Sequence, residues 1–378
     1  MISMKVLIIG GNGLIGGAVV RASVESGREV YVFGRHGCSF VDDNVHFIKG
    51  DWYDDKTALK TVECTDYDVI IDTLIFNEMQ LRRTAAIVNG HCRHFVYIST
   101  DSVYEHPSLG ITEDKIIDAN VKWKYGVDKR KAELYLQDHS EDYSFAWTII
   151  RPTFTFGLSR LPVGFPGKRN TFDLCERIKS GKPVIRFDDP KTKHAMCHES
   201  VFGVAANALF LNPKAYGQTY HISDDVAYTY GEVFDVLEKA LGCEGDYVFL
   251  SADVLKDDFK DLYEDMIYDK NPEFTLDNSK IKAACPGVSF HVELSEVIKS
   301  ITDNLRLFRG VDKDISDYDL MTDFLLIISG KDEIKDYVSG LTDDYINNVK
   351  CYGKREKRRL KCQKIRAKLG LIKRRIHL

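Results

Sequence analysis

The segment KVLIIGGNGLIGG, residues 5–17, decides the fold. An apolar run of strand length leads directly into three glycines spaced as G-x-x-G-x-x-G, and a helix-like stretch follows. The first glycine of such a loop allows a tight turn, the second lets a pyrophosphate approach the backbone, and the third lets the helix pack on the strand. A glycine-rich turn can be no more than a turn, but its place between strand and helix predicts a dinucleotide site. The expected binding residues are Gly10, Asn12, Gly13, Leu14, Ile15 and Gly16.

Short apolar runs alternate with helix-like stretches over the first hundred residues. Buried strands separated by helical crossovers are typical of a parallel sheet with helices on both faces. The sequence therefore predicts an α/β fold: a Rossmann-type doubly wound parallel sheet with a smaller mixed α/β C-terminal substrate lobe. The expected strands are 5–10, 29–34, 45–50, 68–75, 94–99 and 145–152, and the expected helices include 80–91 and 126–139.

The texture of the sequence changes after residue 160, where glycine and proline cluster. We expect residues 1–160 to form the NAD(P)-binding Rossmann domain. Residues 161–310 are expected to form the substrate-binding lobe, from which a segment can return to the Rossmann sheet. Residues 311–350 have the pattern of an acidic helical extension, and residues 351–378 that of a basic amphipathic tail.

The net charge of −5 combines two regions of opposite sign. Residues 351–378 carry twelve Lys and Arg against one acid, so this tail is +11 and the rest of the chain is −16. The acidic body disfavours general nucleic-acid binding. Three interpretations of the tail stay open: peripheral contact with an anionic membrane, docking on the acidic body or on a partner, and contact with RNA.

Targeting signals and cysteine usage bear on the compartment. No apolar stretch approaches the roughly 20 residues of a membrane span, and the N-terminus lacks the apolar region of a signal peptide. The nine cysteines are scattered without a CxxC pair, so neither a disulfide framework nor a metal site is predicted. We therefore expect a cytoplasmic protein, peripheral to a membrane if the tail binds one.

The end of the second expected strand bears on the choice of cofactor. An acid normally stands there, about 20 residues beyond the loop, to bind the adenosine ribose. This chain has Gly34 followed by Arg35, which can pair with a 2′-phosphate or can be only a solvated surface arginine. NADP is therefore favoured, with NAD as the alternative. Asp51 is placed to contact the adenine amino group, or is a loop or helix N-cap acid.

The strand expected at 94–99 leads into Thr100, and Tyr125 and Lys129 follow at a helix start. Tyr and Lys four apart share one helix face, so the ammonium can lower the phenol pKa from about 10 toward neutrality. Such a phenol can exchange a proton with a substrate hydroxyl or carbonyl while a nicotinamide exchanges hydride. Thr100 would give that oxygen a second hydrogen bond. A Y-x-x-x-K spacing alone is usually a surface pair, and its position after the loop and this strand gives it weight.

Together, GGNGLIG, STDSVY, YGVDK and RPTFTFG resemble the extended short-chain dehydrogenase/reductase superfamily, in its NAD-dependent epimerase/dehydratase branch, over residues 4–308. The resemblance implies catalytic roles for Thr100, Tyr125 and Lys129, with Lys129 also contacting the nicotinamide ribose. It implies epimerisation or ketoreduction of a sugar or sugar nucleotide by transient hydride transfer, as in surface glycan synthesis, and often a homodimer. Family dehydratases have T-D-E where this chain has Thr100-Asp101-Ser102, so a 4,6-dehydratase is not expected.

The second half departs from this family pattern. The family's sugar-nucleotide epimerases hold the substrate diphosphate with an arginine four residues before a histidine; here the histidine is His198 and His194 replaces the arginine. The same half resembles a branch that includes plastid proteins associated with ribosomes and RNA. The alternative function is therefore an atypical cofactor-binding protein with a structural or RNA-associated role. The residues that could hold a substrate anion instead are Lys168, Arg169, His194 and Lys270.

Overall fold

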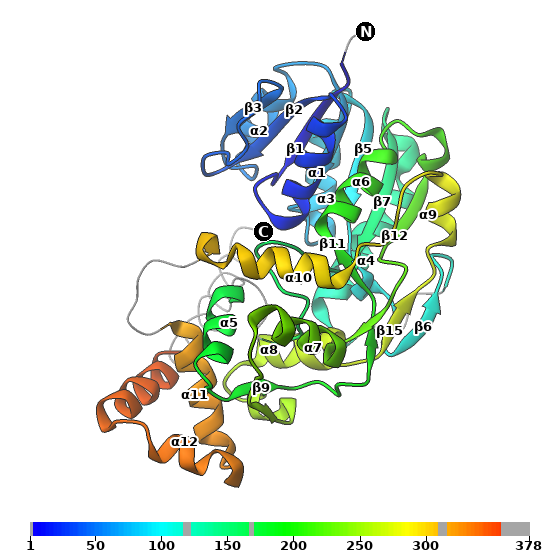
Figure 1. Cartoon of the computed structure of the whole chain (residues 1–378). Coiled ribbons are helices and arrows are strands. Elements are labelled where there is room, and N and C mark those ends of the chain that lie inside the picture. The colour runs from blue at the N-terminus through cyan, green and yellow to red at the C-terminus, as the bar shows by residue number, and fades with distance from the viewer. Residues whose placement is uncertain (1–2, 116–121, 166–169, 309–315, 357–378) are drawn as a thin grey trace. The chain divides into compact units, whose positions relative to one another are not determined.

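The computed structural model describes residues 3–115, 122–165, 170–308 and 316–356. Seven parallel strands form the main sheet, in the order β12-β7-β5-β4-β1-β2-β3 (Figure 1). The order reverses beside β1, which is where doubly wound sheets open a crevice for a ligand. The predicted α/β class with a doubly wound parallel sheet is thus confirmed. The strands are β1 (Lys5–Ile9), β2 (Glu29–Gly34), β3 (Val45–Lys49), β4 (Tyr67–Asp72), β5 (Cys92–Ile98), β7 (Ala146–Pro152) and β12 (Gln218–Ile222).

Helices cover both faces of this sheet, because successive side chains of a buried strand point in opposite directions. Val6 and Ile8 of β1 belong to a buried cluster that includes residues of α1 and α6. Leu7 and Ile9 belong to a second cluster, which includes residues of α2, α3 and α4. The helices are α1 (Leu14–Glu25), α2 (Asp55–Val62), α3 (Glu78–Val88), α4 (Lys124–Asp138) and α6 (Glu199–Ala208).

The register of the strands brings their carboxyl ends to one edge. Ile9 of β1 pairs with Phe33 of β2 and with Asp72 of β4. Farther along the sheet, Ile98 of β5 pairs with Ile150 of β7. The loops that follow β1, β2, β4 and β5 therefore start at the same edge, where the sequence places its candidate site residues.

The chain folds into two compact units, and both are discontinuous in sequence. The first unit combines Met1–Leu158, Lys191–Tyr230 and Pro272–Val297. It contains the main sheet, a four-stranded sheet in the order β13-β10-β15-β6, and the pair β8 with β11. Its remaining elements are β6 (Ser108–Ile111), β8 (Phe154–Phe156), β10 (Lys193–His194), β11 (Met196–His198), β13 (Tyr228–Thr229), β15 (Phe274–Leu276), α9 (Ser279–Ala284) and the short helices η1 (Asp101–Val103), η2 (Ser140–Asp142) and η3 (Pro213–Ala215).

The second unit combines Ser159–Pro190, Gly231–Asn271 and the chain from Ile298 onward. Two of its helices, α7 and α10, begin at or just before a unit boundary. Its elements are α5 (Thr171–Lys179), β9 (Val184–Arg186), α7 (Tyr230–Leu241), β14 (Tyr247–Phe249), η4 (Ala252–Leu255), α8 (Lys260–Asp265), the π-helical η5 (Met266–Lys270), α10 (Leu294–Asp303), η6 (Leu305–Phe308), α11 (Asp317–Ser329), η7 (Asp332–Ile334) and α12 (Lys335–Ser339).

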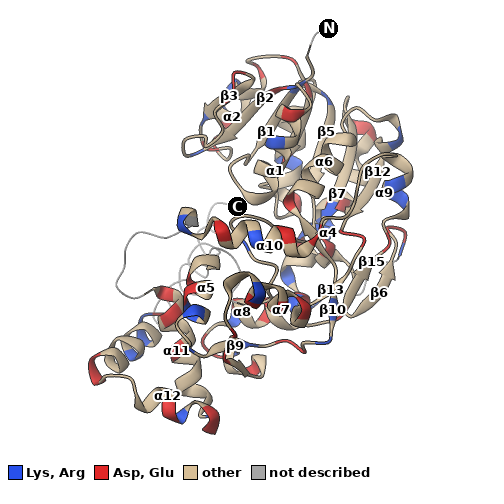
Figure 2. Cartoon of the chain, in the orientation of Figure 1, with Lys and Arg blue, Asp and Glu red and all other residues tan. Residues whose placement is uncertain are grey.

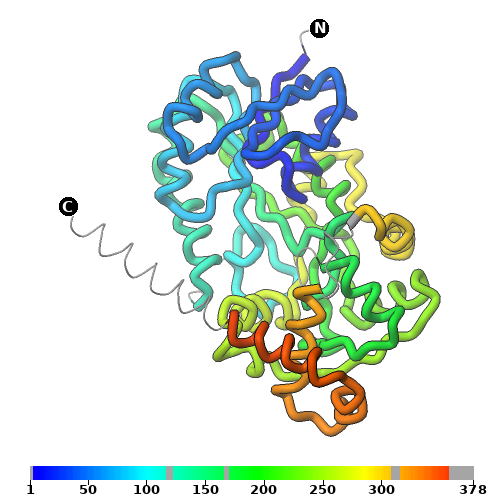
Figure 3. Tube along the Cα trace, turned by 90° about the vertical axis from the view of Figure 1, so that its left-hand side faces the viewer, coloured from blue at the N-terminus to red at the C-terminus, as the bar shows by residue number. Residues whose placement is uncertain are grey.

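Helix α11, whose first turn is acidic, is held inside the second unit by a buried arginine (Figure 2). Arg177 of α5 donates to Asp319 Oδ1 at 2.7 Å and also pairs with Asp323. The helical residues 343–356 pack on α11, because a Cβ at Gly353 would overlap the Phe324 ring (Figure 3). Within the described ranges, no helix is both long and apolar enough to cross a membrane.

This division differs from the consecutive regions that the sequence suggests. The first boundary, after Leu158, lies next to the expected one at 160. Beyond it, residues 191–230 and 272–297 return to the first unit, and β12 becomes an edge strand of the main sheet. Residues 316–350 and the described part of the tail, 351–356, belong to the second unit. The sequence allows for a return of one segment to the Rossmann sheet, but it does not show which residues return, because this depends on pairing between distant segments.

The close packing of α6 on α1 makes a prediction about stability. A Cβ at Gly203 would lie 2.3 Å from the carbonyl oxygen of Ala18. We expect Gly203→Ala to lower the free energy of unfolding by about 1–3 kcal/mol through overpacking. Alanine is otherwise favoured over glycine inside a helix by roughly 1 kcal/mol, so a loss can only come from packing. Gly37→Ala is the control, since its Cβ position has no atom within 4 Å. Urea unfolding measures both, and equal stability of the two variants would contradict the packing argument.

Candidate active site

The loop after β1 leaves room for an anion at the N-terminus of α1. Gly10 has a φ of +85°, in the region that favours glycine. A Cβ at Gly16 would lie 2.4 Å from the Gly10 carbonyl oxygen, so a glycine is required for this approach of helix to loop. Gly13 is the N-cap of α1, and no atom outside its chain neighbours lies within 3.6 Å of its Cβ position. Leu14 and Ile15 form the first helical turn and are half-buried. The backbone N–H groups at the N-terminus of α1 can therefore face a pyrophosphate.

Asn12 ties this loop to the segment after β2. Its side-chain amide donates to the carbonyl oxygens of His36, at 3.4 Å, and Gly37, at 3.2 Å. A Cβ at Gly34 would come within 3.2 Å of the same amide nitrogen, so a larger residue there, including the usual acid, would crowd Asn12. Arg35 is the next residue and is exposed. The position that normally selects NAD thus holds a glycine, next to the Asn12 amide, and is followed by an accessible cation.

Asp51 lies in the loop after β3 and is exposed. Its carboxylate accepts the backbone N–H of Tyr53 at 3.1 Å. The N-cap of α2 is Asp54, which accepts the N–H of Thr57, so Asp51 does not cap the helix. Its contact with adenine stays a prediction.

Thr100 is buried directly after β5, where it caps the short helix η1. Its Oγ1 accepts the Ser102 N–H at 3.2 Å and lies 3.0 Å from the Ser102 hydroxyl oxygen. The helix that carries Tyr125 packs against this turn, because a Cβ at Gly126 would lie 2.3 Å from the Ser102 carbonyl oxygen. Glycine at 126 therefore lets the start of α4 approach the end of β5.

Lys129 lies in α4, one turn after Tyr125, with its side chain 2% exposed. Its ammonium donates to the carbonyl oxygens of Ile75, at 2.6 Å, and Ile98, at 2.8 Å. These carbonyls follow β4 and end β5. The nitrogen lies 6.0 Å from the centre of the Tyr125 ring. The two side chains thus share one face of α4, as their spacing predicts, while their catalytic roles stay predictions.

Burial and two nearby carboxylates set the protonation of Lys129. Burial lowers the pKa of the Lys129 ammonium to about 7, and the carboxylates of Asp72 and Glu133 oppose this effect. Asp72 is itself buried, and burial raises its pKa to about 6. Its carboxylate accepts the N–H of Leu74 at 2.7 Å and the Thr84 hydroxyl at 3.1 Å. The site therefore holds two groups that titrate near neutral pH.

A buried polar network lies next to these residues and was not predicted from the sequence. Arg151 of β7 donates to Glu133 through Nε, at 2.9 Å, and Nη2, at 2.7 Å, and to the Tyr104 hydroxyl oxygen at 2.8 Å. His221 Nε2 donates to the Asp277 carbonyl oxygen at 2.7 Å, so its Nδ1 accepts from the Tyr104 hydroxyl at 3.1 Å. Burial lowers the pKa of His221 to about 4, which keeps this ring neutral.

Two signals in the sequence could have revealed this network. Glu133 lies four residues after Lys129 and so faces the same side of the helix. Arg151 interrupts an otherwise apolar strand. A charged residue at a core position implies a buried partner of opposite charge.

The four predicted substrate residues have different surroundings. His194 is buried in the first unit and stacks on Tyr230, with ring centres 4.3 Å apart. Lys270 is buried in the second unit and forms an ion pair with Asp269. Lys168 and Arg169 lie outside the described residues. Binding of a substrate anion by any of the four stays a prediction.

Comparisons with characterised proteins identify relatives of this chain. It is 24% identical to the chloroplast stem-loop binding protein of 41 kDa b from Arabidopsis thaliana over 260 residues, 64% of each chain, and so spans less than two thirds of that relative. It is 24% identical to the probable low-salt glycan biosynthesis reductase Agl14 of Haloferax volcanii, covering 67% of this chain and 85% of the relative. It is 22% identical to the 2'-dehydrokanamycin reductase of Streptomyces kanamyceticus, covering 64% and 67%.

Solved structures of similar fold include two epimerases. Epimerase Mth375 of Methanothermobacter thermautotrophicus superposes with a TM-score of 0.67 at 16% identity, covering 81% of this chain and 94% of the other. UDP-glucuronic acid 4-epimerase of Bacillus cereus, solved with UDP-glucuronic acid and NAD, superposes with a TM-score of 0.63 at 18% identity. The superposition covers 81% of this chain and 100% of the epimerase. At these identities the likeness establishes the fold alone.

Family membership rests on the sequence match together with this fold. Residues 3–284, three quarters of the chain, match the NmrA-like family. The matched region includes the glycine loop, Thr100, Tyr125 and Lys129. The resemblance to the short-chain dehydrogenases/reductases is thereby confirmed, and the chain belongs to the NmrA-like family, an NAD(P)-binding family of that type.

Proposed function

We propose that this protein is an NAD(P)-dependent reductase or epimerase of a sugar or sugar nucleotide. The observation that carries the proposal is the position of the buried Lys129 ammonium. Two backbone carbonyls accept hydrogen bonds from it, and its nitrogen lies 6.0 Å from the centre of the Tyr125 ring. Burying a cation is costly, and a buried ionisable group with a shifted pKa is therefore a candidate for a functional role. The names of two relatives, a glycan biosynthesis reductase and a dehydrokanamycin reductase, support ketoreduction and a role in glycan synthesis. Ser102, in place of the dehydratase acid, argues against dehydration.

Each residue of the proposed site has a separate role in the reaction. The Tyr125 hydroxyl exchanges a proton with the reacting oxygen of the substrate, and the Lys129 charge favours the phenolate. The Thr100 hydroxyl makes a second hydrogen bond to that oxygen. The glycine loop holds the cofactor pyrophosphate at the N-terminus of α1. The nicotinamide, when bound, donates or accepts hydride.

Replacement of the proposed acid/base tests this function. We expect Tyr125→Phe to abolish hydride exchange, because it removes the hydroxyl that exchanges the proton with the substrate, while cofactor affinity stays nearly unchanged. Mass spectrometry of the molecules that co-purify with the protein guides the choice of sugar, and NAD(P)H absorbance follows turnover. Tyr135→Phe is the matched control on the same helix, since the Tyr135 hydroxyl lies 3.1 Å from the Tyr143 hydroxyl and has no role in the proposed chemistry. Retained activity in Tyr125→Phe would refute the role.

A second candidate function is RNA association with vestigial chemistry. It is favoured by the similarity to the chloroplast stem-loop binding protein. The unaltered protein would then exchange hydride with no keto-sugar and would bind RNA in a salt-sensitive way that needs residues 351–378. Hydride exchange without such binding excludes this candidate.

NADP is the proposed cofactor because Arg35 is exposed after β2 and no acid stands at position 34. A charge-assisted hydrogen bond contributes about 1.5–3 kcal/mol, so Arg35→Ala should weaken NADPH binding by roughly tenfold to a hundredfold. NADH binding should not change, since NADH lacks the 2′-phosphate. Fluorescence titration of both nucleotides measures this, and an equal effect on the two would mean that Arg35 does not read the 2′-phosphate.

For the tail we propose peripheral contact with an anionic membrane. Truncation after Glu356 keeps the described helix, in which Tyr352 is buried, and removes ten of the twelve tail cations. Each Lys or Arg near such a surface contributes about 1 kcal/mol. The full chain should float with anionic liposomes and not with neutral ones, and the truncated chain with neither. If the two chains float equally, the tail is not the membrane anchor.

A further inference from the structure

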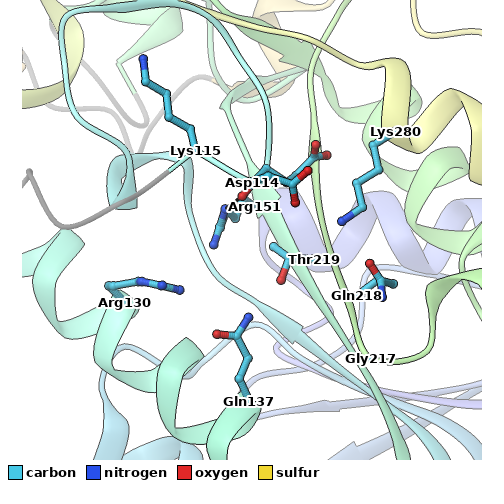
Figure 4. Close-up of a pocket in the computed structure, with 10 residues that line it drawn as sticks. Asp114, Lys115, Arg130, Gln137, Arg151, Gly217, Gln218, Thr219 and Lys280 are labelled. Atoms are coloured by element: carbon cyan, nitrogen blue, oxygen red, sulfur yellow. Dashed lines mark hydrogen bonds between the residues drawn. The ribbon is translucent and has the colours of Figure 1, made fainter.

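A polar pocket opens in the first unit, beside α4 and next to the buried network of Glu133 and Arg151. Its volume is about 360 Å³, within the usual range for small-molecule sites. It is lined by α4, by Gly217 and the first residues of β12, and by residues 113–115, and Lys280 of α9 also contributes (Figure 4). Arg151 lies at the carboxyl end of β7 and Gln137 two turns beyond Lys129 on α4, so the pocket runs from the edge of the proposed active site along α4. We propose that it binds a small hydroxylated molecule through one oxyanion group held by Arg130.

Arg130 has an unused donor in this pocket. Its Nη1 donates to Glu133 Oε2 at 3.0 Å. Its Nε–H is buried and has no partner within the part of the chain that the structure describes. The edge of a guanidinium that includes Nε matches the two oxygens of a carboxylate or phosphate. A buried donor without a partner is costly, and a ligand oxyanion would satisfy it.

A second unused group faces the same space. The Thr219 side chain is 8% exposed, and its Oγ1 has no hydrogen-bond partner among the described residues. Figure 4 shows the Arg130 guanidinium, the Gln137 amide and the Thr219 hydroxyl turned toward one another. One ligand oxyanion could therefore accept from the guanidinium, the amide and the hydroxyl together.

Arg151 also lines the pocket, but its donors already have partners. Nε and Nη2 bind Glu133, and Nη1 binds the Tyr104 hydroxyl oxygen. Arg130 is therefore the arginine that we expect to bind the ligand oxyanion. Lys280 adds a second cation, with its ammonium 5.2 Å from the centre of the Tyr220 ring and directed toward the pocket (Figure 4).

Two carboxylates restrict the ligand further. Glu113 is buried and accepts the His221 N–H at 3.1 Å, whereas Asp114 is exposed. Lys115 also lines the pocket, but its ammonium points away from the centre (Figure 4). Carboxylates repel a bare polyanion and accept hydrogen bonds from hydroxyl groups. The groups present thus fit a polyol that carries a single phosphate or carboxylate, as in a sugar phosphate or sugar acid.

Calorimetric titration of the full chain tests this proposal without any measurement of turnover. Glucose 6-phosphate and glucuronate distinguish a phosphate from a carboxylate, and inorganic phosphate and glucose probe the two halves of the ligand separately. We expect saturable binding of one of the two sugar anions, weaker binding of inorganic phosphate, and none of glucose.

Variants assign the binding to this pocket. Arg130→Lys keeps the charge but loses the Nε edge, so the affinity should fall about tenfold. Thr219→Val removes the unpaired hydroxyl and should weaken binding severalfold without loss of stability. Arg93→Lys is the matched control, because Arg93 forms an exposed ion pair with Asp68 elsewhere in the unit.

The proposal is overturned if neither sugar anion binds saturably. It is also overturned if Arg130→Lys binds as tightly as Arg93→Lys, because the anion then lies elsewhere, for example at the glycine loop. Should Arg130→Lys fail to fold, Thr219→Val decides by the same comparison. Neither result decides whether the protein is a reductase or epimerase, because the Tyr125→Phe variant tests that proposal separately.

Discussion

The buried ion pair between Glu133 of α4 and Arg151 of β7 is the contact on which the rest of the site depends. Both side chains are at most 2% exposed, and two hydrogen bonds, of 2.9 and 2.7 Å, join them. Burying both charges is costly, and losing one partner would leave the other uncompensated, at a cost of about 3–5 kcal/mol. Helix α4 carries Tyr125, Lys129 and Arg130, so this pair fixes the proposed acid/base and the pocket arginine relative to the sheet.

Glycines determine how closely the other elements approach this helix and the sheet. Gly126 lets α4 contact the Ser102 carbonyl, and Gly16 lets α1 contact the loop after β1. Side chains at either position would push the helix outward and would move the groups that it carries. The same residue type thus sets the geometry of both the cofactor loop and the Thr100 turn, although the two are far apart in sequence.

The sequence predicts the structure correctly where a local pattern of residues determines it. Apolar runs identify the strands of the Rossmann half, and the spacing of Tyr125 and Lys129 places both on one helix face. It was insufficient where distant segments meet. Arg177, for example, binds Asp319 across more than a hundred residues. His194 is buried and stacks on Tyr230, a contact that no local pattern reports, and its binding of a substrate anion stays a prediction.

Glu133 also links the two sites electrostatically. Its carboxylate accepts from Arg130 and Arg151, and its charge is one of two that keep the Lys129 pKa from falling further. The protonation of Lys129 therefore depends on how much of that negative charge the two arginines neutralise. An oxyanion bound to Arg130 would offset part of this neutralisation and favour the Lys129 ammonium. Binding of an anion in the pocket would in this way raise the pKa of Lys129 through one buried carboxylate that contacts both arginines.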